Sequence, residues 1–214
     1  MTLSRSIATY RPFSFLRSGL IAAGALFVSC CPLFAQRDAG LLGKQYAGLT
    51  VFTEDVRHVD IGSGYGTGVT ANFPVTSHLD VSLAASYERF NDVRLTDKRL
   101  NASVVGYQEV SGVKLFVDGS LGSTSQSIKI ADQKITNNDG LYAFGIGIEA
   151  PIAPATALFG RIAYNRYFDQ DNGDYWTYSV GLNHWISEKL GLVIAVTAYD
   201  DDSIVYGAGV NLRF

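Results

Sequence analysis

The chain has 214 residues, carries a formal net charge of −3, and contains two cysteines and no run of basic residues. Such an acidic chain is a poor candidate for nucleic-acid binding, which depends on clustered lysines and arginines. It also lacks an apolar run of the roughly 20 residues that a transmembrane helix needs. Its length suits one domain, and no linker or break in composition divides it.

Residues 1–35 have the pattern of a secretory signal peptide. Three arginines and no acidic residue precede a short apolar run over residues 20–28. We expect cleavage after Ala35, which leaves residues 36–214 as the exported domain. Because cleavage removes basic residues only, the exported domain is more acidic than the full chain.

Both cysteines, Cys30 and Cys31, lie in the segment that we expect to be removed. The exported domain would then have no disulfide, no thiol chemistry and no metal site built on thiolates. An alternative hypothesis is lipid attachment at Cys30, because residues 27–30 loosely match a lipoprotein signal. Phe27 departs from that pattern.

The exported domain alternates between apolar and small or polar residues in ten segments, a period typical of β-strands. Most have the length of about 9–11 residues that a tilted strand needs to cross a bilayer. The alternative is eight strands, if the weaker segments 45–53 and 98–108 do not span. The ten segments are 45–53, 62–73, 79–90, 98–108, 112–121, 140–150, 156–168, 174–185, 190–199 and 204–214.

Short and longer connections alternate between these segments. An even number of strands places both termini on one side, which we predict to be the periplasm, with short turns there. The longer connections are then predicted to be extracellular loops. These loops are 54–61, 91–97, 122–139, 169–173 and 200–203.

Each predicted strand has one apolar face and one small, polar or charged face. Within 79–90, for example, Val81 and Leu83 alternate with Asp80 and Ser82. The period alone allows a soluble lipocalin-like barrel with the apolar face inside, or a membrane barrel with that face outside. Charges of both signs on the polar faces and aromatic residues near strand ends favour the membrane barrel. The sequence therefore predicts an all-β fold, a closed antiparallel transmembrane β-barrel.

The exported domain resembles the small bacterial outer-membrane β-barrels of the opacity-protein and OmpA/OmpX type. Four stretches carry the resemblance: 64–69, 79–87, 140–149 and 205–214. It implies location in the cell outer membrane, contact with outer-membrane lipid, and recognition by the barrel-assembly machinery. Members usually have eight strands, so ten is a departure. The terminal residues that resemble the family's assembly signal are Tyr206, Val210, Leu212 and Phe214.

Two groups of charged residues are candidate sites. The first is expected in the lumen, either as a constriction that selects ions or as ion pairs that close the barrel. The second is an acidic rim that is a weak candidate for Ca²⁺ or Mg²⁺, since hard cations prefer carboxylate oxygens; we expect no other cofactor. The lumen group is Glu88, Lys114, Asp118, Glu149 and Arg161; the rim group is Asp169, Asp171, Asp174, Asp200, Asp201 and Asp202.

The sequence contains no recognisable catalytic motif. We therefore expect a monomeric, non-enzymatic structural or surface-interaction protein of the cell envelope, with no nucleic-acid partner. The alternative is a small porin-like channel for ions or small solutes through the charged lumen. A weaker alternative is a membrane-embedded hydrolase that uses His58 beside Glu54, Asp55 and Asp60.

Overall fold

The computed structural model describes residues 39–56, 63–90, 94–130, 133–169 and 173–214. These residues belong to one compact unit, Ala35–Phe214, and no helix among them is long and apolar enough to cross a membrane. The expected signal peptide and His58 lie outside the described residues.

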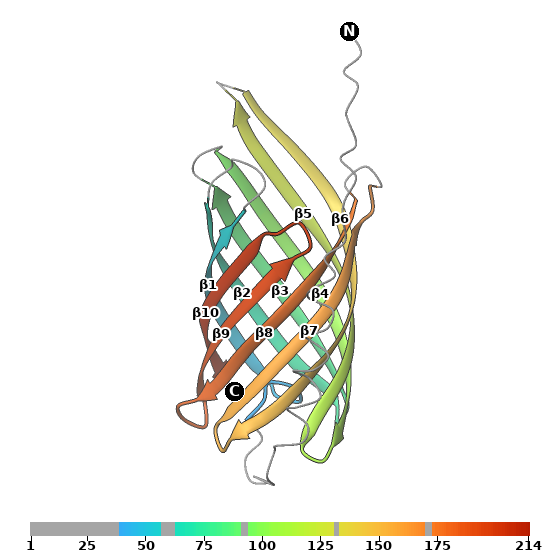
Figure 1. The fold of residues 1–214 in the computed structure, drawn as a ribbon, viewed down its shortest axis with the longest axis vertical. Coiled ribbons are helices and arrows are strands. Elements are labelled where there is room, and N and C mark those ends of the chain that lie inside the picture. The colour runs from blue at the N-terminus through green and yellow to red at the C-terminus, as the bar shows by residue number, and fades with distance from the viewer. Residues whose placement is uncertain (1–38, 57–62, 91–93, 131–132, 170–172) are drawn as a thin grey trace. The chain divides into compact units, whose positions relative to one another are not determined.

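Ten antiparallel strands form one closed barrel in which each strand pairs with its neighbours in sequence and β1 pairs with β10 (Figure 1). The eight-strand alternative is wrong, because segments 45–53 and 98–108 lie in β1 and β4, which are paired on both sides. The strands are β1 Tyr46–Asp55, β2 Ser63–Thr76, β3 Leu79–Phe90, β4 Leu95–Val110, β5 Val113–Ile130, β6 Gln133–Ala153, β7 Thr156–Tyr167, β8 Asp174–Trp185, β9 Leu190–Tyr199 and β10 Ile204–Arg213.

The apolar face of the barrel points outward. On β1, Leu49 and Val51 are 51% and 57% exposed, whereas the glutamate on the alternate face, Glu54, is half-buried. Large exposed apolar residues occur on every strand except β7, whose side chains are all buried or half-buried. Such a surface is typical of a barrel whose outer face contacts lipid. The predicted direction of the two faces is confirmed.

The predicted loop 122–139 is wrong. Its residues extend β5 and β6, whose ladder continues from Gly122 opposite Leu141 to Ile130 opposite Gln133. Apart from three isoleucines, the segment is mostly polar. The alternation of apolar residues that marks a membrane strand therefore ends before this segment, whereas the hydrogen-bonded ladder continues through it. The resulting hairpin projects beyond the other strands (Figure 1). We call this end of the barrel the loop end, and the opposite end, where β1 begins and β10 ends, the turn end.

The terminal strand closes the barrel. Tyr46 of β1 lies opposite Arg213 of β10, and the pairing continues without a shift to Asp55 opposite Ile204. The four apolar residues of the predicted assembly signal lie on the outer face, and Phe214 is 62% exposed. Their use in assembly stays a prediction.

Candidate functional site

The lumen is lined by polar and charged side chains of the barrel. Whether these side chains leave the lumen open or closed bears directly on the function of the protein. At the turn end the lumen holds residues Ala39–Lys44, which we call the plug segment (Figure 1). Ala39 and Lys44 are only 1% and 8% exposed. A chain segment buried in this way must find partners for its main-chain polar groups.

Lumen side chains of the strands provide those partners. Glu149 Oε2 accepts a hydrogen bond from Leu41 N at 2.6 Å. Asp80 Oδ2 accepts one from Gly43 N at 2.8 Å, and Lys114 Nζ donates to Leu42 O at 2.7 Å. Further donors to the main-chain oxygens of Lys44, Ala39 and Gly40 are Asn72 at 2.8 Å, Asn183 at 2.9 Å and Trp185 at 3.4 Å. Residues from five strands therefore hold the plug segment in place.

Two glycines allow the plug segment to fit among these side chains. Gly43 has φ 79°, a left-handed conformation that disfavours other residues. A Cβ atom at Gly40 would overlap the carboxylate of Glu149. The segment therefore depends on a small residue at one position and on an unusual backbone conformation at another.

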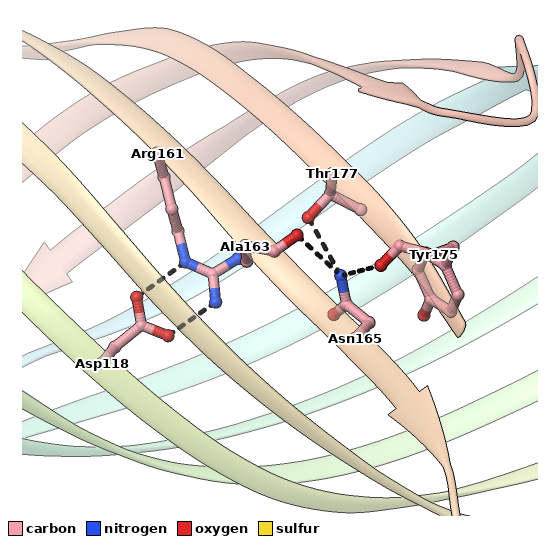
Figure 2. Close-up of polar contacts among 6 residues, drawn as sticks. All are labelled: Asp118, Arg161, Ala163, Asn165, Tyr175 and Thr177. Carbon is pink, nitrogen blue, oxygen red and sulfur yellow. Dashed lines mark hydrogen bonds and ion pairs between the residues drawn. The ribbon is translucent and has the colours of Figure 1, made fainter. Parts of the chain in front are cut away.

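An ion pair spans β6 on the inner wall of the barrel (Figure 2). Arg161 of β7 donates from Nε to Asp118 Oδ2 at 2.8 Å and from Nη2 to Asp118 Oδ1 at 2.6 Å. The two residues reach each other over β6, where Gly145 leaves the space for both side chains. This two-point geometry is the strong form of a charged hydrogen bond.

Aromatic rings occupy the lumen beside other glycines. Phe52 lies over Gly66 on the neighbouring strand, and Phe116 lies over Gly147 in the same way. Phe159 and Gly181 repeat the arrangement on β7 and β8. The glycines of the lumen face therefore make room for rings from adjacent strands.

Arg99, Asp97 and Tyr199, which we call the Arg99 group, extend across the lumen at the loop end. Arg99 of β4 binds Asp97 Oδ2, with Nε at 2.9 Å and Nη2 at 2.8 Å. It also interacts with Tyr199 of β9, which lies five strands away in either direction around the barrel. Tyr199 continues into a row of rings, since its centroid lies 5.7 Å from that of Tyr175, which in turn lies 5.9 Å from that of Tyr167.

The barrel has polar and charged side chains in its lumen and an apolar outer face, as barrels that span a membrane do. A sequence model described as the outer membrane protein beta-barrel domain matches residues 21–214. The chain belongs to this family. Its ten strands are therefore transmembrane strands, and its location is the outer membrane.

Several solved outer-membrane barrels are similar in fold. Neisserial surface protein A is 13% identical, with 79% of this chain and 96% of that chain covered and a TM-score of 0.43. The KdgM porin, solved in complex with disordered oligogalacturonate, is 12% identical, with 79% and 99% covered and a TM-score of 0.47. The NanC porin is 9% identical, with 78% and 100% covered and a TM-score of 0.47. No curated protein matches the chain.

Within this outer-membrane barrel, the five charges predicted for the lumen all lie on its inner face. Arg161 and Asp118 form the central ion pair, and Lys114 and Glu149 both bind the plug segment. Glu88 lies apart from them at the loop end, 6% exposed, next to Glu54. The five residues therefore belong to three levels of the lumen and do not form one constriction.

Two acidic residues of the predicted rim form hydrogen bonds with separate partners. Asp174 accepts a hydrogen bond from the Tyr164 hydroxyl at 2.7 Å, and Asp201 accepts one from Ser203 N at 2.9 Å. Partial burial raises the pKa of the Asp200 carboxyl. Asp171 lies outside the described residues, and no three acidic, histidine or cysteine side chains within them are grouped to hold a metal ion. The calcium or magnesium site stays a prediction.

The sequence did not predict the plug segment or the side chains Asn72, Asp80 and Asn183 that hold it. Asp80 and Asn183 are fully buried, and Asn72 is 4% exposed. One feature of the sequence that indicates these side chains is their common position, because all three are polar residues on lumen faces near the turn end. The other was the short segment with two glycines between the cleavage position and the first strand.

Proposed function

We propose that this protein is a closed, non-enzymatic barrel that acts as a structural or surface-interaction protein of the cell envelope. The observation that supports this most directly is that the lumen holds interacting groups at three heights. These groups are the plug segment at the turn end, the Arg161–Asp118 pair on the lumen side of β6 and the Arg99 group, which reaches across the lumen to β9 at the loop end. An eight-stranded lumen is just wide enough for side chains or one small ligand, and ten strands are intermediate between this size and the barrels of about 16 or more strands that leave an aqueous channel.

The pairing of lumen charges also supports a closed barrel. A conducting constriction needs charges that remain available to passing ions. Here the Asp118 carboxylate is satisfied by Arg161, and the Glu149 carboxylate binds main-chain N–H groups. These charges stabilise the groups that occupy the lumen.

One observation favours the alternative of a small channel. At the loop end, three acidic residues, Glu54, Glu88 and Asp97, lie close to the guanidinium of Arg99. The buried Oε1 atom of Glu88 has no hydrogen-bond partner. An acidic entrance of this kind attracts cations, so the alternative channel would be cation-selective.

Single-channel recording in a planar bilayer separates the two functions. We expect no discrete current steps from the inserted full protein. As a positive control, a variant that lacks the plug segment and carries Arg161→Ala, Asp118→Ala and Arg99→Ala should conduct. Reproducible steps from the unaltered protein, with ion selectivity that changes in Arg161→Ala, would establish the channel.

The weaker hydrolase alternative is tested with the same preparation. A hydrolase would cleave a lipid ester or a peptide bond, and the His58→Ala variant would lose that activity. The proposed function predicts that neither the unaltered protein nor the His58→Ala variant hydrolyses these substrates.

A further inference from the structure

Five exposed basic side chains lie together at the loop end, on or beside β3 to β6. Arg89, Lys98, Lys129 and Lys134 occupy the outward-facing positions of their strands, and Arg94 precedes β4. We call these five residues the basic patch. No ion pair joins any of them to another described residue.

The lower part of the basic patch adjoins outward-facing tyrosines. Arg89 lies directly opposite Tyr65 on β2, and Lys98 lies directly opposite Tyr87 on β3. The two tyrosines are 59% and 42% exposed. Tyrosines on the outer face near strand ends mark the level of lipid headgroups. Arg89 and Lys98 are therefore at headgroup level.

The upper part of the basic patch places like charges against each other. Lys129 of β5 and Lys134 of β6 are directly opposite in the projecting hairpin. Like charges in this relationship destabilise a β ladder. A bound anion would remove this repulsion, so an anionic partner would stabilise the hairpin.

The opposite end of the barrel lacks such a patch. Among the described residues, Lys189 is the one lysine or arginine on the outer surface of the turn end, and it follows Glu188. The basic residues outside the lumen are thus concentrated at one membrane surface, although the chain as a whole is acidic.

We propose that the basic patch binds the phosphate groups of anionic lipid in the leaflet at the loop end. Arg89 and Lys98 would contact phosphates at headgroup level, and Lys129 and Lys134 would contact phosphates that stand further from the bilayer. Long basic side chains bury their stems at such a surface and extend the charge to the headgroups. The position beside the tyrosines argues for a lipid over a soluble polyanion.

Calorimetric titration of the full protein with lipid A, a diphosphorylated glycolipid, in neutral detergent micelles tests this proposal. Each basic side chain near an anionic lipid surface contributes roughly fivefold in affinity. The variants Arg89→Gln/Lys98→Gln and Lys129→Gln/Lys134→Gln should each bind about tenfold or more weakly. Lys189→Gln is the matched control and should bind as the unaltered protein does.

Three results would overturn the proposal: unchanged affinity in both double variants, equal binding of dephosphorylated lipid A, or displacement of the lipid by an equal concentration of inorganic phosphate. The hairpin variant keeps the test valid if the other variant fails to fold, because its substitutions lie near the hairpin tip. Electrophoretic mobility before and after heating confirms that each barrel is folded.

Discussion

Arg161 and Asp118 form a two-point ion pair across the strand that separates them, directly over Gly145. The side chains of Arg161 and Asp118 are 29% and 6% exposed. The pair therefore combines a buried carboxylate with a guanidinium that keeps some contact with water.

Removal of one partner should cost more than removal of both. Asp118→Leu leaves the Arg161 charge in the lumen without its carboxylate, and we expect the free energy of unfolding to fall by about 3 kcal/mol. Asp118→Leu with Arg161→Met replaces the pair by apolar groups and should cost less than about 1 kcal/mol. Urea unfolding of the barrel in lipid vesicles measures both values. Equal losses in the two variants would show that the charges do not act as a pair.

Gly145 should be required for the same ion pair. A Cβ atom there would lie 2.5 Å from Asp118 Oδ2 and 2.8 Å from Arg161 Nε, so both side chains must shift. We expect Gly145→Ala to cost about 1 to 2 kcal/mol in the same unfolding measurement. Gly106→Ala is the control, since a Cβ at that position first meets Val117 Cγ2 at 3.9 Å. The Gly145→Ala penalty should shrink when Asp118 and Arg161 have been replaced.

The plug segment should open when Glu149 is removed. Ala39→Cys places a thiol at a site that is 1% exposed, in a chain in which Cys30 and Cys31 are replaced by serine. Hydrogen bonds to charged groups contribute about 1.5 to 3 kcal/mol each, so Glu149→Ala should speed maleimide labelling by about tenfold or more. Glu188→Ala, in an exposed turn, should leave the labelling rate unchanged. Fast labelling before any substitution would contradict the closed turn end.

Deletion of Phe214 should impair assembly without destabilising the assembled barrel. Phe214 is 62% exposed, and its main-chain N–H makes only a 3.4 Å contact with Gln45 O. We expect less folded barrel in the outer membrane, and a change within about 0.5 kcal/mol in the free energy of unfolding. Phe144→Ala is the control, because Phe144 is equally exposed on β6. Normal insertion after the deletion would show that the terminal residue is not an assembly signal.

Local patterns made most of the barrel predictable. The period of two places Val210 and Leu212 on one face and Asn211 on the other whatever the strand pairs with. This local rule gave the ten strands and their two faces, and the charges on the polar faces together with the aromatic residues near strand ends indicated which face points outward. The local rule failed over 122–139, because beyond the bilayer the ladder continues with mostly polar residues on both faces, and hydrophobic alternation no longer reports it.

By itself, the sequence predicted a closed barrel of ten strands, its outward apolar face and the strand faces that line the lumen. Only the tertiary structure decided what those lumen residues do. Leu41 and Glu149 are 108 positions apart, and Asp118 and Arg161 are 43 apart. The pairing of the strands brings such residues together, and spacing along the chain does not indicate which side chains will meet in the lumen. The plug segment has no periodic pattern of its own, so its position depends entirely on the side chains that barrel closure gathers around it.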